Sequence, residues 1–116
     1  MIKFLRSFLY ALQGIIASFS DQRNLKVQFA VALITIGAGF YFDITSVEWC
    51  VILLTIAMVI SLEMMNSAIE NVVDLITREV NPLAGKAKDI AAGAVLFASI
   101  VAIIVGVLVF KKYLIV

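Results

Sequence analysis

The sequence predicts an all-α integral membrane protein, on the strength of three observations. Of its 116 residues, 64% are hydrophobic and only 15% are charged, whereas a soluble domain is about half apolar and a quarter charged. Three long apolar runs are separated by short polar breaks that contain turn-forming residues. Polar residues also recur at helical spacing along one of the runs. We therefore expect one membrane domain over residues 1–116, with an amphipathic surface helix followed by three transmembrane helices.

Residues 1–19 have the pattern of an amphipathic helix that lies at the membrane surface. Apolar side chains recur at helical spacing on one face, whereas Lys3, Arg6 and Tyr10 share the opposite face. A signal peptide is the competing interpretation. It is disfavoured because the apolar residues are periodic and no small-x-small cleavage site follows a continuous apolar core. A polar break over residues 20–24 then separates this helix from the first span.

The first transmembrane helix is predicted over about residues 25–42. This segment is almost wholly apolar, and Gln28 and Thr35 interrupt it. A short turn over residues 42–48 follows. Thr45 or Ser46 is expected to cap the next helix.

The second and third spans follow on either side of a polar loop. The second helix is predicted over about residues 47–76 and extends beyond the hydrocarbon into the interface. Residues 77–86 are predicted as the loop, because Asn-Pro and Gly are strong breakers. The third helix is predicted over about residues 88–110, where the segment from residue 90 to 110 has no charge.

The distribution of basic residues predicts the orientation in the membrane. In the three-span arrangement seven Lys and Arg side chains fall on one side and only Lys111 and Lys112 on the other. Because cytoplasmic loops carry the excess of Lys and Arg, we expect a cytoplasmic N-terminus and an external C-terminus. The protein is thus expected in a bacterial cytoplasmic membrane, with the 77–86 loop facing the compartment that holds ATP and Mg²⁺.

The second helix carries a stripe of polar side chains, Glu63, Asn66, Glu70 and Asp74. At about 100° per residue they fall within an arc of about 80° on one side of the helix. Ionisable residues inside a membrane span are costly, so their presence predicts a functional site. A structural helix–helix seam, an ion or proton path and an enzyme site are the three alternatives.

The neighbouring residues favour phosphoryl transfer. Carboxylates bind Mg²⁺, which usually takes one or two of them together with substrate phosphates. Lys86 and Lys88 precede the third span and can neutralise phosphate oxygens. Glu63 lies at the depth of a lipid alcohol, where a poorly solvated carboxylate is a candidate general base.

Other functional classes receive no support from the composition. The chain has no histidine, and its one cysteine excludes an internal disulfide and a multi-cysteine zinc site. Neither GxxxxGK[ST] nor GxGxxG occurs. A net charge of +1 gives no basis for binding nucleic acid.

Two motifs resemble those of a known family. The strings E-x-x-N-S-A-I-E-x-V-V-D, from Glu63 to Asp74, and L-A-G-K-A-K-D, from Leu83 to Asp89, resemble the small prokaryotic diacylglycerol kinase family, which includes undecaprenol kinases. The resemblance covers nearly the whole chain. It implies a homotrimeric membrane enzyme, with active sites at subunit boundaries, that uses ATP and Mg²⁺ to phosphorylate a lipid hydroxyl.

The same resemblance implies roles for individual residues. Glu63 looks like the catalytic base with Asn66 supporting it, and Glu70 looks like a metal ligand. The positions that match nucleotide contacts are Tyr10, Glu79, Lys88 and Asp89, with Lys3 where some relatives have a basic contact. Asp74 belongs to the motif and is expected to support the site.

One position departs from the family pattern. Members commonly carry a second metal-binding glutamate before the first span, often within E-x-N, whereas this chain has the string DQRN. Gln22 occupies the place of that glutamate and offers a neutral carbonyl oxygen. Asp21 is the alternative ligand, through a small shift of the backbone. The sequence leaves both this choice and the choice between diacylglycerol and undecaprenol open.

Overall fold

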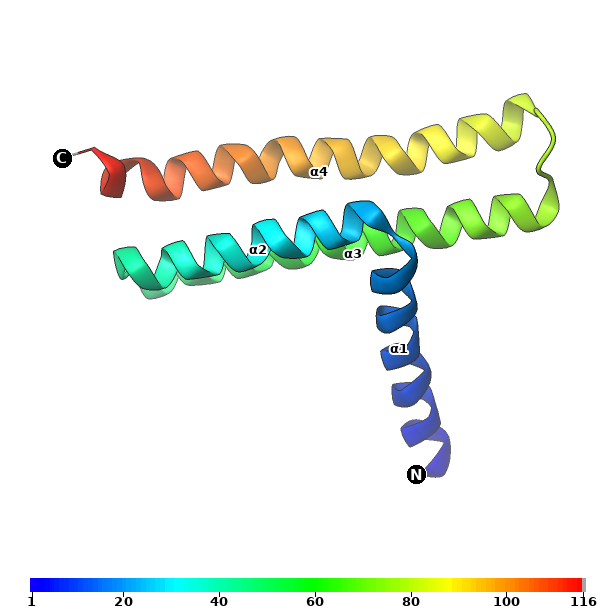
Figure 1. Ribbon diagram of the computed structural model, residues 1–116, viewed down its shortest axis with the longest axis horizontal. Helices are drawn as coiled ribbons and strands as arrows, with labels where there is room; N and C mark the ends of the chain where they lie inside the picture. The colour runs from blue at the N-terminus through cyan, green and yellow to red at the C-terminus, as the bar shows by residue number, and fades with distance from the viewer. Residues whose placement is uncertain (116) are drawn as a thin grey trace.

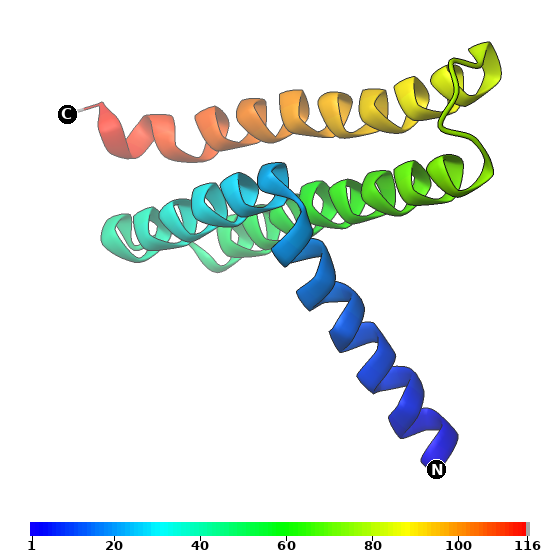
Figure 2. The same cartoon turned by 45° about the vertical axis from the view of Figure 1, so that its right-hand side comes forward.

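Four helices account for nearly all of the chain. The computed structural model describes residues 1–115, in which the helices are α1 (Ile2–Asp21), α2 (Arg23–Phe42), α3 (Ser46–Ile76) and α4 (Pro82–Leu114). Figure 1 shows α2, α3 and α4 lying horizontally beside one another, each antiparallel to the one before it in the chain, while α1 leaves them at a steep angle. The view in Figure 2 shows the same departure of α1. The all-helical fold predicted from the sequence is confirmed over the described residues.

The break between α1 and α2 is shorter than the sequence predicts. A single residue, Gln22, has an extended backbone and separates the two helices. The polar stretch over residues 20–24 is otherwise helical. Its side chains are mostly exposed and leave the helical backbone hydrogen bonds intact, so only Gln22 departs from helical geometry.

The turn from α2 to α3 follows from local chemistry. Asp43 has φ 53°, a left-handed conformation that ends α2 and that Asp tolerates better than most residues. Thr45 then caps α3: its hydroxyl accepts from Glu48 N at 3.2 Å, and its own N–H donates to the Glu48 carboxylate at 2.9 Å. This reciprocal pair is a capping box, so of the two predicted caps Thr45 is the one used.

The loop before α4 ends earlier than the sequence predicts. The structure places the loop over residues 77–81 and begins α4 at Pro82, not near residue 88. The Asn81 side chain accepts from Leu83 N and Ala84 N, and Pro82 occupies the first helical turn, where no backbone N–H is needed. Asn81 and Pro82 therefore start a helix here instead of breaking one. Lys86, Lys88 and Asp89 consequently lie on a helix.

Buried residues, most of them small, mark the faces along which α2 and α4 pack. On α2 the buried positions recur every seven residues, and on α4 two buried alanines have the same spacing, a pattern that keeps one seam facing its neighbour. These positions are Leu25, Ala32 and Gly39 on α2, and Ala91 and Ala98 on α4.

The end of the bundle beside the α2–α3 turn has its own core. Ile44, Ile52 and Val109 are buried there. The Glu48 carboxylate pairs with Lys112 at 2.9 Å and accepts a hydrogen bond from the Tyr113 hydroxyl at 2.5 Å. These contacts fix the start of α3 to the end of α4.

Helix lengths set the position of the polar stripe relative to a membrane. All four helices are long and apolar enough to cross a bilayer by length and composition, α1 included. A bilayer core about 30 Å thick needs about 20 helical residues, and α3 has 31 residues. No charged residue occurs between Glu48 and Glu63. The last turns of α3, from Glu63 onward, therefore lie at the edge of the apolar segment and beyond it.

Candidate functional site

The polar stripe of α3 faces the other helices and does not point outward. Glu63 is 3% exposed, Asn66 9% and Ser67 5%, although much of the surrounding apolar surface is exposed. Ser67 donates to the backbone carbonyl of Glu63 at 3.1 Å. A buried carboxylate, amide and hydroxyl within five residues of one helix form a polar centre that an apolar helix bundle does not need for packing.

Gln28 of α2 is the residue that meets Glu63. Its side-chain nitrogen, Nε2, donates to the Glu63 carboxylate oxygen Oε2 at 3.5 Å. At this distance the contact lies at the outer limit of hydrogen bonding. Gln28 also lines a cavity of about 330 Å³ between α2, α3 and α4, whose walls are mostly apolar.

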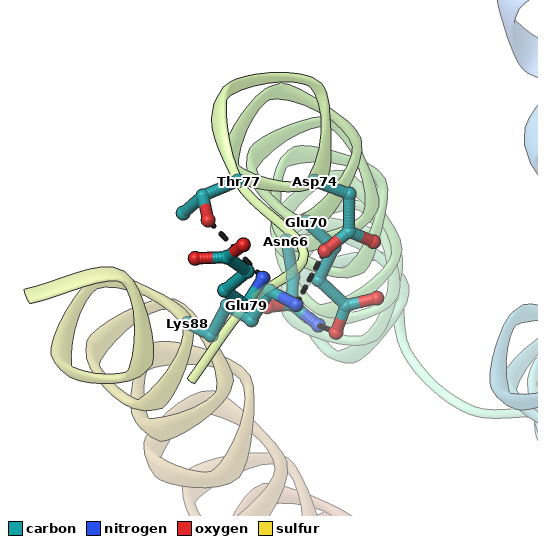
Figure 3. Close-up of polar contacts among 6 residues, drawn as sticks. All are labelled: Asn66, Glu70, Asp74, Thr77, Glu79 and Lys88. Carbon is teal, nitrogen blue, oxygen red and sulfur yellow. Dashed lines mark hydrogen bonds and ion pairs between the residues drawn. The ribbon is translucent and has the colours of Figure 1, made fainter. Parts of the chain in front are cut away.

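One turn further along α3, Asn66 contacts Glu70. Asn66 Nδ2 donates to Glu70 Oε1 at 3.5 Å, and Figure 3 shows the two side chains beside one another on α3. The other end of the Asn66 amide, Oδ1, is buried and has no hydrogen-bond partner within the described chain. A buried oxygen without a partner costs about 1–3 kcal/mol, so its retention here points to a ligand.

Lys88 connects α4 to the end of the stripe. Its ammonium lies 2.6 Å from Asp74 Oδ1, and Figure 3 shows it reaching across from α4 to α3. Asp74 lies three turns beyond Glu63, outside the apolar segment. The Lys88 ammonium lowers the pKa of this carboxyl, chiefly through their hydrogen bond. Both side chains are about one-third exposed, so solvent reaches the pair.

The remaining predicted residues lie at the periphery. Glu79 is exposed in the 77–81 loop, and its backbone N–H donates to the Thr77 hydroxyl at 3.1 Å (Figure 3). Asp89 is exposed on α4. Lys3 and Tyr10 are exposed on α1, which runs away from the other helices. The structure therefore joins Asp74 to Lys88 and Asn66 to Glu70. Within one chain it does not bring the peripheral residues of this paragraph to the stripe.

The two candidates for the second metal ligand lie at the junction of α1 and α2. Gln22 is half-buried and Asp21 is exposed. Within residues 1–115 no three Cys, Asp or Glu side chains are clustered as a ready-made metal site. Mg²⁺ does not require such a cluster, since one or two carboxylates suffice when phosphates complete the coordination.

The polar centre includes one residue outside the predicted site. Gln28 appears in the sequence only as an interruption of the first span. The signal that could have identified it is its polarity in an otherwise apolar segment, which in a membrane helix favours a partner on a neighbouring helix. Sequence periodicity on α3 alone cannot say which residue of α2 faces Glu63.

Comparisons with known proteins identify the family of this chain. The model of the prokaryotic diacylglycerol kinase family matches residues 9–110. The chain is 41% identical over 108 residues to the undecaprenol kinase of Bacillus subtilis, covering 93% of this chain and 88% of that protein. It is 41% identical over 101 residues to a diacylglycerol kinase of Synechocystis, covering 86% and 58% of the two chains. It is 32% identical over 95 residues to the diacylglycerol kinase of Escherichia coli K12, covering 82% and 78%.

The family match spans the polar end of α3, the 77–81 loop and most of α4, which together hold the buried carboxylate and the Lys88–Asp74 pair. Four apolar helices and these relatives place the protein in the inner membrane. The chain belongs to the prokaryotic diacylglycerol kinase family.

Proposed function

We propose that this protein transfers the γ-phosphate of ATP to the hydroxyl of a membrane lipid, with Glu63 as the general base. Family membership makes the chain a lipid kinase with ATP as a substrate. The observation that supports the location of the chemistry is the burial of Glu63, 3% exposed, at the end of the apolar part of α3. A lipid alcohol has its hydroxyl at this depth, between the hydrocarbon and the aqueous phase that holds ATP.

Glu63 has the environment that a base for a lipid alcohol needs. A base must come within hydrogen-bond reach of the proton that it removes. The Gln28 amide of α2 donates to the Glu63 carboxylate, and the Ser67 hydroxyl donates to the Glu63 backbone carbonyl. Neither neighbour is a cation that would neutralise the carboxylate. Glu63 therefore takes the proton of the attacking hydroxyl as the bond from its oxygen to the γ-phosphorus forms and the bond from that phosphorus to the β–γ bridging oxygen breaks, releasing ADP.

The next turn of α3 fits a hard divalent cation. Glu70 supplies a carboxylate and Asn66 a buried, unpartnered amide oxygen, and oxygen donors are the ligands that Mg²⁺ prefers. Gln22 is our preferred further ligand, with Asp21 as the alternative. A bound Mg²⁺ would neutralise charge on the phosphates of ATP, with Glu70 and Asn66 as the residues that would hold it. Glu70 and Asn66 then orient the nucleotide relative to Glu63.

Residues at the far end of the stripe and beyond it are suited to contact the nucleotide. Lys88 offsets charge on the transferred group, and Asp74 holds its ammonium in place until the nucleotide arrives. Asp89, Glu79, Tyr10 and Lys3 are the further nucleotide contacts. Tyr10 and Lys3 lie on α1, which points away from the bundle of its own chain.

This direction of α1 supports assembly as a homotrimer. In a trimer with sites at subunit boundaries, the α1 helix of one protomer can reach the stripe of the next. We also propose that α1 lies at the membrane surface. The excess of basic residues near the N-terminus and in the 77–86 region supports a cytoplasmic N-terminus and an external C-terminus.

The test is phosphate transfer from γ-labelled ATP by purified protein in bilayers, with diacylglycerol and undecaprenol compared in parallel. We expect label in at least one lipid and ATP consumption that requires that lipid. Neither lipid becoming labelled, or ATP turnover that is independent of lipid, would reject the proposal. Ion flux through the same bilayers without transfer would instead support the alternative of an ion path along the stripe.

A further inference from the structure

Gln28 has a position that packing of an apolar helix does not explain. It is half-buried on α2, lines the cavity between α2, α3 and α4, and donates to Glu63 from 35 residues away in the sequence. Its carbonyl oxygen, Oε1, is buried and has no hydrogen-bond partner within the described residues. An apolar side chain of the same size would fill this position without that unmet oxygen, because a buried polar atom without a partner is unfavourable.

The two threonines that line this cavity behave differently. Thr35 lies two turns along the same helix, and its hydroxyl donates to the backbone carbonyl of Val31 at 2.8 Å. Thr55 of α3 makes the same bond to Val51 at 2.7 Å. Both threonine hydroxyls therefore have a hydrogen-bond partner within their own helix. Gln28 instead directs its amide to a carboxylate on another helix.

We infer that Gln28 is a positioning residue for Glu63, a role that deepens the proposed function and rests on it. The amide nitrogen holds carboxylate oxygen Oε2, while no hydrogen bond within residues 1–115 engages Oε1. One oxygen is therefore fixed and the other is left to receive the proton of the lipid hydroxyl. An amide suits this task because it donates a hydrogen bond without carrying a charge that would pair with the base.

If Gln28 positions Glu63, replacing Gln28 should lower the rate of transfer without lowering the stability of the protein. Gln28→Met keeps the length of the side chain and removes both the donor and the unmet oxygen. We expect kcat to fall roughly 10- to 100-fold, the loss typical of a misplaced reacting group, with KM for ATP unchanged. The midpoint of thermal unfolding in detergent micelles should equal or exceed that of the wild type. Thr35→Val is the matched control in the same cavity, and we expect it to leave kcat unchanged.

A second variant keeps the test decisive if the Met variant does not fold. Gln28→Asn retains an amide but withdraws it by one carbon–carbon bond, about 1.5 Å, so it cannot reach Glu63. It should also lower kcat at least 10-fold with KM for ATP unchanged. A kcat within threefold of the wild type for either folded variant would overturn the inference.

Double variants with Glu63→Gln separate this inference from the proposed function. If Gln28 acts through Glu63, adding Gln28→Met to Glu63→Gln should lower the residual rate no further. A multiplicative loss together with a lowered unfolding midpoint would assign Gln28 a structural role and overturn the inference. If Glu63→Gln alone keeps near-normal transfer, the proposed base is wrong, and the inference falls with it. If Glu63→Gln is inactive but Gln28→Met transfers phosphate at the normal rate, the inference about Gln28 is rejected and the proposed function stands.

Discussion

Gly39 gives a quantitative test of how the end of the bundle distant from Glu63 is packed. A Cβ atom built at Gly39 would lie 2.7 Å from Trp49 Cη2, 2.9 Å from Trp49 Cζ2 and 3.2 Å from Ile44 Cδ1. Favourable carbon–carbon contacts lie at about 3.5–4.0 Å. The Trp49 ring, whose centroid lies 4.9 Å from that of Phe40, would therefore have to move by roughly 1 Å. Overpacking of this kind costs about 1–3 kcal/mol.

Gly37 is the matched control for this prediction. It lies on the same helix, and a Cβ there meets nothing within 4 Å. Gly→Ala gains about 1 kcal/mol of helix propensity at either position, so comparing the two variants cancels that term. We expect Gly39→Ala to be less stable than Gly37→Ala by about 1–3 kcal/mol, measured by unfolding in detergent micelles. Equal stabilities would refute the close approach of α2 to Trp49.

Two further predictions concern the proposed metal site. Glu70→Ala should raise the Mg²⁺ concentration needed for half-maximal transfer and weaken ATP binding, and an unchanged Mg²⁺ titration would reject Glu70 as a ligand. If Gln22 is a neutral ligand, Gln22→Glu should raise the apparent Mg²⁺ affinity, because a carboxylate adds a full charge at the cation. If Asp21 is the ligand, Asp21→Asn should weaken that affinity and Gln22→Glu should change little. If neither variant shifts the titration, this segment does not touch the metal.

Helices and caps that depend only on residues close together in the sequence could be predicted. The three apolar runs become α2, α3 and α4, and Thr45 caps α3 together with Glu48, as the residue types predict. The loop before α4 could not be bounded correctly, because Asn81 and Pro82 serve equally well as breakers or as the start of a helix. The hydrogen bonds from Asn81 to Leu83 and Ala84 decide between the two.

The periodicity of the sequence does not predict which residues of neighbouring helices contact one another. The spacing of Glu63 and Asn66 predicts a common face of α3, and both residues are buried. The spacing does not predict that Gln28 meets Glu63 or that Lys88 pairs with Asp74, because each pairing depends on the rotation and depth of a second helix. The motif resemblance named Lys88 and Asp74 without naming their contact, and it did not include Gln28.

The most direct test of the account is the rate of phosphate transfer by Glu63→Gln. The substitution keeps the size of the side chain and removes the base, and loss of a general base typically costs about 10²–10⁴-fold in rate. Removing a charge from a residue that is 3% exposed relieves a burial cost, so the unfolding midpoint should change little. We predict a folded variant that binds ATP and transfers phosphate to lipid at least 100-fold more slowly than the wild type. Near-normal transfer by this variant would contradict the assignment of Glu63 as the base.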